Sequence, residues 1–150
     1  MKIDIKRDTV SESEEVIFST LDSLGVDDQA IVDLIVRSKE TERQRFRLCV
    51  HGEPSAPQHE MFIVHPHNAY IPPHKHLNKT ESLLVIEGTT DYFTFDEQGN
   101  ITKQITLKKP GSGESFYYRV ADSIYHSMLI QSEVLVFLEI STGPFCRHDT

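Results

Sequence analysis

Hydrophobic residues in the first forty positions recur with the period of a helix. A helix is predicted from residue 11, because Ser11 and Glu14 have the spacing of a capping box and Gly25 is a typical stop. Its apolar positions are Val16, Ile17, Leu21 and Leu24. A second helix is predicted from Asp27, and its apolar face is Ala30, Ile31, Leu34 and Ile35. Residues 1–42 are therefore expected to form an N-terminal helical extension.

From about residue 43 the hydrophobic pattern changes to a period of two. Arg45 and Arg47 alternate with Phe46 and Leu48, which predicts a strand with one apolar face and one wet or functional face. Further short strands are predicted at 61–64, 82–86, 92–95, 101–107, 116–120, 126–130 and 134–140. Turn residues such as those at 110–113 separate them. Many short strands with no helical pattern between them predict an all-β antiparallel sandwich or barrel over residues 43–150, as one compact unit.

Composition and charge narrow the classes of function. The 150 residues include 15 Lys and Arg against 23 Asp and Glu, for a formal charge of −8. An acidic surface repels phosphate backbones and anionic lipid, so neither nucleic acid nor a membrane surface is an expected partner. The chain has no long apolar run and no signal-peptide core, and Cys49 and Cys146 have no pairing pattern. A cytoplasmic location is the default expectation.

Histidine is concentrated in one part of the chain. Of 8 histidines, five lie within residues 59–76: His59, His65, His67, His74 and His76. His74 and His76 are two positions apart, so on an extended backbone their imidazoles point to the same side and can share a metal ion. Glu81 follows on the next predicted strand and offers a carboxylate oxygen. His65 and His67 have no acid at matching spacing and are interpreted as solvent-facing or supporting residues.

The segment from His74 to Gly88 has the pattern H-x-H-x4-E-x6-G and resembles the first motif of the cupin superfamily. The resemblance implies a double-stranded β-helix, or jelly-roll, barrel. It also implies that a later histidine, His126, completes a ligand set with His74, His76 and Glu81. Two positions depart from the family: a glycine before the first motif is replaced by Asn68, and a Pro-x-Gly turn before the second by residues 121–123.

A narrower resemblance covers most of the chain beyond residue 40. The matching segments are Arg45-x-Arg47-x-x-x-His51, Tyr70-Ile-x-Pro-His-x-His76 with Lys79 and Glu81, Phe95-Asp96-x-x-Gly99, and Gly143-Pro144-Phe145. Together they are similar to WbuC-family cupin metalloproteins, small bacterial proteins associated with clusters for surface-polysaccharide biosynthesis. That family usually has Asn where Cys49 stands here. Cupin barrels frequently pair through their sheets, so the resemblance also implies a homodimer.

Further residues are candidates for contact with a small-molecule ligand. Arg45 and Arg47 share a strand face with His51, and guanidinium groups suit carboxylates and phosphates. The alternative is that both arginines lie on a solvated outer face. Tyr70 and Tyr92 are mostly core candidates by default, but a tyrosine can also present its polar tip to a cavity. His51 is the candidate general base.

Two hypotheses of function follow from these residues. In the first, the protein is a metal-dependent enzyme of isomerase, dioxygenase or lyase type that acts on a small polar, anionic or sugar-derived metabolite. Its cofactor is one divalent ion, with Fe, Mn, Ni, Co and Zn all open, and four protein ligands leave positions for a substrate. In the second, the chain is a non-catalytic binding or sensing module that uses the metal to hold its ligand. A polar group beside the metal favours catalysis, and an apolar cavity favours binding.

Overall fold

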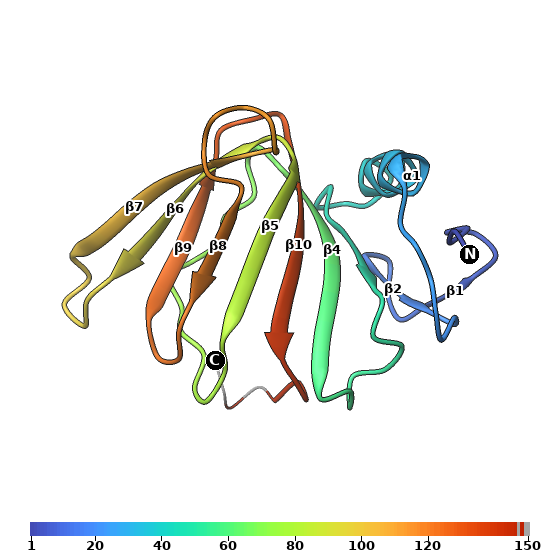
Figure 1. Ribbon diagram of the computed structural model, residues 1–150, viewed down its shortest axis with the longest axis horizontal. Coiled ribbons are helices and arrows are strands. Elements are labelled where there is room, and N and C mark those ends of the chain that lie inside the picture. Colours follow the sequence, from blue (N-terminus) through green and yellow to red (C-terminus); the bar gives the residue numbers. More distant parts are fainter. Residues whose placement is uncertain (147, 149–150) are drawn as a thin grey trace.

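The structure is a computed structural model that describes residues 1–146 and 148, and these residues form two β-sheets and one helix (Figure 1). The helix is α1 (Asp28–Ser38). The strands are β1 (Thr9–Ser11), β2 (Val16–Ser19), β3 (Phe46–Cys49), β4 (Gln58–Pro66), β5 (Glu81–Glu87), β6 (Thr89–Phe95), β7 (Ile101–Lys108), β8 (Tyr117–Val120), β9 (Tyr125–Ile130) and β10 (Val134–Thr142). Every strand predicted after residue 43 is present, with ends that differ by a few residues.

The helix predicted from residue 11 is wrong, because this part of the chain contains β1 and β2. β2 pairs in parallel with β3, and Ile17 is buried between the sheet and α1. Glu14 does not close a capping box; its carboxylate accepts a hydrogen bond from the backbone of Glu42. Val16 and Ile17 are β-branched and Phe18 is aromatic, so pairing with a buried strand outweighs the weak local capping signal. The helix predicted from Asp27 is confirmed, with Asp27 as its N-cap.

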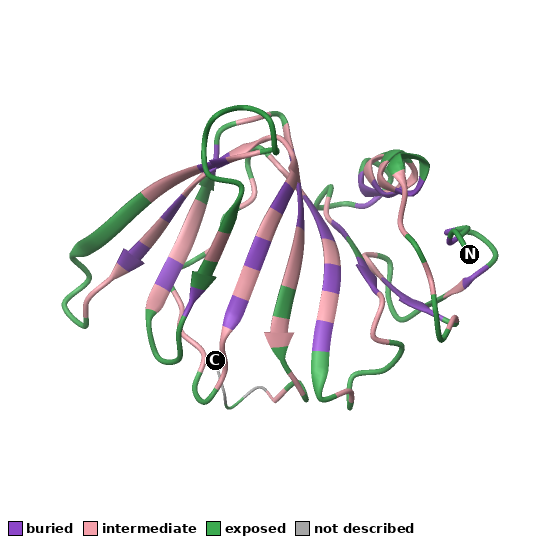
Figure 2. Cartoon of the chain, in the orientation of Figure 1, coloured by how far each residue is buried: buried purple, intermediate pink, exposed green. Residues whose placement is uncertain are grey.

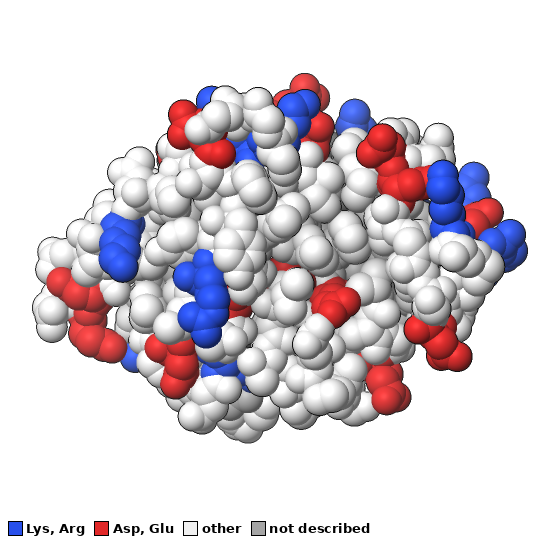
Figure 3. All heavy atoms as spheres, viewed as in Figure 1, with Lys and Arg blue, Asp and Glu red and all other residues white. Residues whose placement is uncertain are grey.

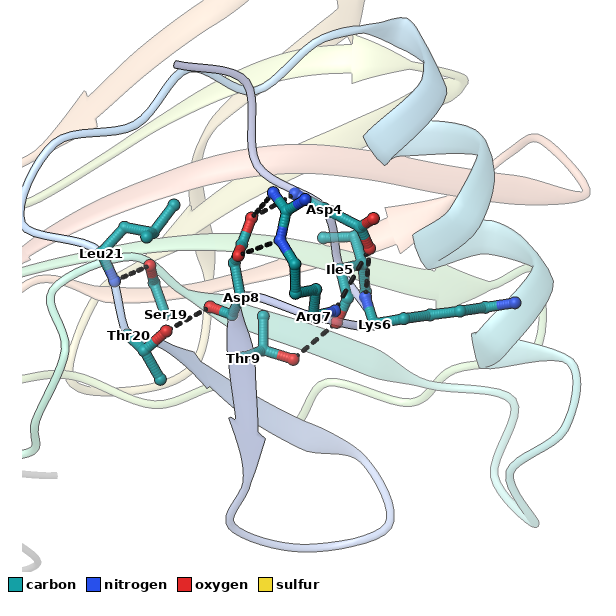
Figure 4. Close-up of polar contacts among 9 residues, drawn as sticks. All are labelled: Asp4, Ile5, Lys6, Arg7, Asp8, Thr9, Ser19, Thr20 and Leu21. Carbon is teal, nitrogen blue, oxygen red and sulfur yellow. Dashed lines mark hydrogen bonds and ion pairs between the residues drawn. The ribbon is translucent and has the colours of Figure 1, made fainter.

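Side-chain hydrogen bonds hold the turn that leads into β1 (Figure 4). The Asp4 carboxylate accepts from the backbone N–H groups of Lys6 and Arg7. The Asp8 carboxylate accepts from the Asp4 backbone and from the Arg7 guanidinium, and this guanidinium lowers the pKa of Asp8 to about 2. Thr20 donates its hydroxyl to the Asp8 carbonyl and so ties this turn to the end of β2. The N-terminal segment is thus part of the sheet structure.

The all-β jelly-roll class predicted from the sequence is confirmed, and its strands form two sheets that are not closed into a barrel. The larger sheet has the order β1-β2-β3-β4-β10-β5-β8, and the smaller has the order β7-β6-β9. The chain passes from the larger sheet to the smaller at Gly88, whose φ is 91° and where a Cβ would lie 2.3 Å from the Val134 carbonyl oxygen. Such a change of sheet at a turn interrupts the hydrogen-bonded ladder, as in double-sheet jelly rolls.

Two apolar cores cover the two faces of the larger sheet. Between the sheets lie residues such as Met61, Leu83 and Phe137. On the outer face, α1 packs Leu34 against Leu48 of β3, and its opposite side is exposed (Figure 2). β3 therefore places Phe46 and Leu48 under the helix, and Arg47 and Cys49 on the side between the sheets. β5 shows the same alternation of buried and less buried positions in Figure 2.

Acidic and basic side chains are interspersed on the face shown in Figure 3, and uncharged residues cover most of its middle. None of the helices in the described part of the chain has the length and apolar character needed to cross a bilayer.

Candidate metal centre

His74 and His126 come from distant segments and lie directly opposite each other. The backbone N–H of His126 donates to the His74 carbonyl at 2.8 Å, and that of His74 donates to the His126 carbonyl at 3.1 Å. His126 belongs to β9, whereas His74 lies in the connection between β4 and β5. This bridge brings the two imidazoles together, with ring centroids 4.4 Å apart.

The loop before β9 is tied to the segment that contains His76. Ser123 donates its backbone N–H to the His76 carbonyl at 2.9 Å, and Asn78 donates its backbone N–H to Asp122 Oδ1 at 2.6 Å. Ser123 has a φ of 62°. That is the left-handed region favoured by glycine, and Ser123 stands where the cupin motif has its glycine. The turn is therefore formed in this chain without Pro or Gly.

The imidazoles are oriented so that ring nitrogens can converge on one ion. One nitrogen from each of His74, His76 and His126 lies within 4.8 Å of the others. Nδ1 of His74 lies 2.8 Å from the Pro72 carbonyl oxygen, and Nδ1 of His126 lies 2.9 Å from that of Ile124. Since a carbonyl oxygen only accepts, each Nδ1 carries the proton and each Nε2 keeps a lone pair for a metal. Metal-binding histidines are commonly held in this way.

Glu81 lies at the start of β5 and faces two of these histidines. Its Oε2 is 3.1 Å from His76 Nε2, and its Oε1 is 3.6 Å from His126 Nε2. Burial raises the pKa of Glu81, but the two histidines outweigh burial and the pKa falls below the usual range. The same partnership raises the pKa of His126 in spite of its burial. A carboxylate held ionised beside three imidazoles is a suitable oxygen ligand for a divalent cation.

His126 supplies a direct test of whether this set fits a metal. Its side chain is buried, and Nε2 has no hydrogen-bond partner among the described residues. A buried polar atom without a partner is costly. A cation placed between Nε2 and the Glu81 carboxylate would satisfy both groups. The residues present therefore fit a metal ion, and His74, His76, Glu81 and His126 are the residues that would hold it.

Tyr92 packs against His126 and is not among the residues that line the cavity beside the site. The ring is 1% exposed and lies nearly parallel to the His126 ring, with centroids 5.8 Å apart. The Tyr92 ring also packs against the Tyr118 ring, with centroids 4.8 Å apart. Burial and the nearby Glu81 raise the pKa of the Tyr92 hydroxyl, so this group stays protonated. We interpret Tyr92 as a residue that positions His126.

A cavity of about 690 Å³ opens beside the histidines and Glu81. Its polar and ionisable lining residues outside the metal set are Glu12, Arg47, Cys49, His59, Lys79, Glu139, Ser141 and Thr142. Its apolar lining residues are Val16, Phe18, Pro54, Met61 and Phe145. The cavity lining thus combines metal-binding residues, apolar side chains and charged groups of both signs.

The structure brings only some of the predicted ligand-contacting residues to this cavity. Arg47 lines it. Arg45 lies farther along the same face, where its Nη2 donates to the Tyr70 carbonyl at 3.2 Å, and the Tyr70 side chain is 73% exposed. His51 lies outside the cavity and stacks on His59, which lines it, with centroids 4.1 Å apart. Burial lowers the pKa of His51.

Glu139 is a functional candidate that sequence reasoning missed. It lies on β10 opposite Met61 and Leu83, which both face the space between the sheets. Burial raises the pKa of Glu139 to about 8, and the nearby Glu81 adds to this rise. The carboxyl group makes no hydrogen bond or ion pair with the residues that the structure describes. In the sequence its only signal is a charged residue between Leu138 and Ile140 in the otherwise apolar run 134–140.

Comparison with solved structures identifies the class of fold. The cupin domain of Schizosaccharomyces pombe Cnp3 superposes with a TM-score of 0.53 at 13% identity, over 67% of this chain and 66% of that one. KdgF from Halomonas sp. gives a TM-score of 0.53 at 12% identity, over 69% and 82% of the two chains. Pumpkin seed globulin gives 0.55 at 12% identity, over 70% of this chain and 28% of that chain. The chain thus has the cupin fold, and at these identities the likeness extends to the fold alone.

The family is shown by sequence. A model of a domain of unknown function, DUF6016, matches residues 26–107, which is more than half of the chain. The chain therefore belongs to the DUF6016 family. A search of curated proteins finds no match. Membership of the WbuC family stays a prediction.

Proposed function

We propose that this protein is a divalent-metal-dependent enzyme that acts on a small polar, anionic or sugar-derived metabolite. The observation that carries the proposal is the composition of one cavity. Two histidines and Glu81 of the metal set share it with Arg47, Lys79 and Glu139. A bound metal would supply a Lewis acid for a carbonyl or hydroxyl group of the ligand.

The residues of the chain have distinct roles in this proposal. Arg47 makes no side-chain hydrogen bond or ion pair with the described residues, so its guanidinium can bind a carboxylate or phosphate of the ligand. Glu139 is the group that would take or give a proton. A carboxyl whose pKa lies near neutral pH suits both directions of transfer. The apolar residues Phe18 and Met61 would exclude water from the carbon skeleton of the ligand.

The rival hypothesis is a binding or sensing module that holds a ligand on the metal without changing it. Glu139 argues against this, because holding a ligand on the metal does not require a second buried carboxyl in the same cavity. The large cavity also has polar groups besides the metal ligands. Both features favour catalysis.

The test begins with elemental analysis of protein purified without chelators, followed by a metabolite thermal-shift screen on the metal-loaded form. Each hit is then incubated with the protein and followed by NMR. Conversion of a hit that is lost in Glu139→Gln but kept in Glu133→Gln, an exposed carboxylate outside the cavity, supports the enzyme. A hit that binds the loaded protein tightly and is recovered unchanged would support the binding module instead.

A further inference from the structure

A second and smaller cavity lies on the same face of the larger sheet, beyond Arg47. Its volume is about 70 Å³. Its lining residues are Glu15, Val16, Arg43, Arg45, Phe46, Arg47, Ile63 and His65. Val16 and Arg47 also line the large cavity, so the two spaces adjoin. The metal-binding residues do not line the smaller one.

Positive charge is in excess around this small cavity, although the whole chain carries −8. Three guanidinium groups, of Arg43, Arg45 and Arg47, face one carboxylate, that of Glu15. Glu15 forms a hydrogen-bonded ion pair with Arg43. The hydrogen bond from Arg43 lowers the pKa of Glu15, and the charges of Arg45 and Arg47 lower it further. The ion pair leaves two positive charges without a carboxylate partner in the cavity.

The fold places these groups together through strand pairing. Arg47 of β3 is opposite Val16 of β2 on one side and Ile63 of β4 on the other. The backbone N–H of Arg47 donates to the Glu15 carbonyl at 2.8 Å, which fixes the start of β2 against β3. The guanidinium of Arg47 has no hydrogen bond or ion pair within the described residues. Nη2 of Arg45 donates to the Tyr70 carbonyl. The other N–H groups of this guanidinium make no hydrogen bond within the described residues.

His65 is an independent sign that something polar is bound here. Its Nδ1 is buried and has no hydrogen-bond partner among the described residues. Its ring packs on Phe137, with centroids 5.7 Å apart. The pKa of His65 is lowered to about 3. Burial is the largest cause, followed by the positive charges of Arg45, Arg47 and Arg43. The imidazole is therefore neutral at pH 7 and offers one N–H donor next to three cations.

We infer that Arg43, Arg45, Arg47 and His65 form an anion site separate from the metal centre, which binds a phosphate or carboxylate group. A water molecule needs roughly 10–15 Å³ of such space, so a cavity of about 70 Å³ has room for a group of several heavy atoms. Forked guanidinium donors and a neutral N–H match the oxygens of a tetrahedral or planar anion. The anion is either a free ion or the charged end of a ligand that extends from the large cavity past Arg47.

The test measures binding of inorganic phosphate by calorimetry to four full-length proteins. These are the wild type, Arg45→Gln, the double variant His74→Ala/His76→Ala, and Arg119→Gln, which removes an exposed arginine on β8. Arg45→Gln should weaken binding roughly ten- to hundredfold, because one charged contact is lost. The double variant and Arg119→Gln should bind phosphate as the wild type does. Arg45→Lys keeps the charge but not the fork and should be intermediate.

A parallel titration with glucose 1-phosphate distinguishes the two sources of the anion. If the site anchors a larger ligand, glucose 1-phosphate binds the wild type more tightly than inorganic phosphate, and this gain is lost in His74→Ala/His76→Ala. If the site takes a free ion, the two affinities are equal. The inference is overturned if neither compound binds, or if phosphate binding is lost with the histidines and unaffected by Arg45→Gln. Metal content, measured separately, tests the metal centre independently of this result.

Discussion

His74 and His126 exchange both of their backbone hydrogen bonds, although one lies before β5 and the other begins β9. This reciprocal pair connects the segment before β5 to β9 by backbone contacts. The carbonyls of Pro72 and Ile124 accept hydrogen bonds from the two imidazoles and so fix their orientation. Ligands whose ring orientation is fixed by such hydrogen bonds are better placed to bind a metal ion.

The first prediction concerns metal content. Protein purified without chelators should contain close to one divalent ion per chain, and His76→Ala or Glu81→Ala should abolish stoichiometric binding, because each removes a ligand of the set. Elemental analysis measures this. His67→Ala is the matched control, because His67 is exposed and lies in the same histidine-rich segment. Full occupancy in His74→Ala/His76→Ala would contradict the assignment.

The second prediction isolates His126. His126→Gln should weaken metal binding by more than about tenfold, since even outer-shell changes at metal sites commonly have effects of that size. The fold should persist, because the apolar core between the sheets is formed by side chains other than those of the metal set. Competition with a chromogenic chelator measures the affinity, and circular dichroism checks the fold. An unchanged affinity in a folded variant would remove His126 from the ligand set.

The third prediction concerns the turn at Gly88. Gly88→Ala should lower the free energy of unfolding by more than the roughly 1–3 kcal/mol expected for a left-handed non-glycine residue, because its Cβ would also clash with the Val134 carbonyl. Gly99→Ala is the matched control: its φ is 84° but nothing lies within 4 Å of the added Cβ. Urea unfolding measures both. Equal losses would show that the clash is relieved by movement of the chain.

The fourth prediction concerns pH and His65, whose folded-state pKa of about 3 lies below the ordinary value of 6.5. A lowered folded-state pKa means that, as the pH falls, the unfolded chain binds the proton at a higher pH than the folded protein does. The contribution of His65 to stability is therefore complete above pH 6.5 and is lost as the pH falls toward 3, with a slope of at most about 1.4 kcal/mol per pH unit.

Chemical unfolding at several pH values measures this slope for His65→Phe and for the exposed control His67→Phe. The His65 variant should have a shallower dependence between pH 6 and pH 4 than the wild type, and the control should not. The comparison cancels the titration of Glu81 and the other carboxyl groups, which are unchanged in all three proteins. Parallel curves for His65→Phe and the wild type would show that His65 titrates normally.

The fifth prediction concerns the two thiols. Cys49 is 2% exposed, and burial raises its pKa to about 11, whereas Cys146 is partly exposed. A disulfide-exchange reagent at pH 8 should therefore titrate one thiol rapidly in the native protein and a second only after unfolding. Cys146→Ser should leave the native protein almost unreactive. Rapid reaction of that variant would show that the large cavity admits the reagent to Cys49.

Several features of this protein follow from the sequence by itself. The period-two pattern after residue 43 located every later strand, because alternation of buried and solvated side chains is a local property of a pleated backbone. The spacing of His74, His76 and Glu81 indicated a shared site for the same local reason. The sequence also indicated that Arg47 lies on the face opposite Phe46, although not which face borders a cavity.

Only the tertiary structure decided the remaining features, because they depend on contacts between distant segments. The residues around Ile17 form a strand and not a helix, since β3 offers a buried partner that no local pattern reveals. Glu139 lines the large cavity because of how β10 pairs with β4 and β5, and Arg45 lies beyond that cavity because it precedes β3. His65 packs on Phe137 and borders the small cavity because β4 pairs with β10 and β3. Local sequence determines the face on which a side chain lies, but sheet pairing determines what that face contacts.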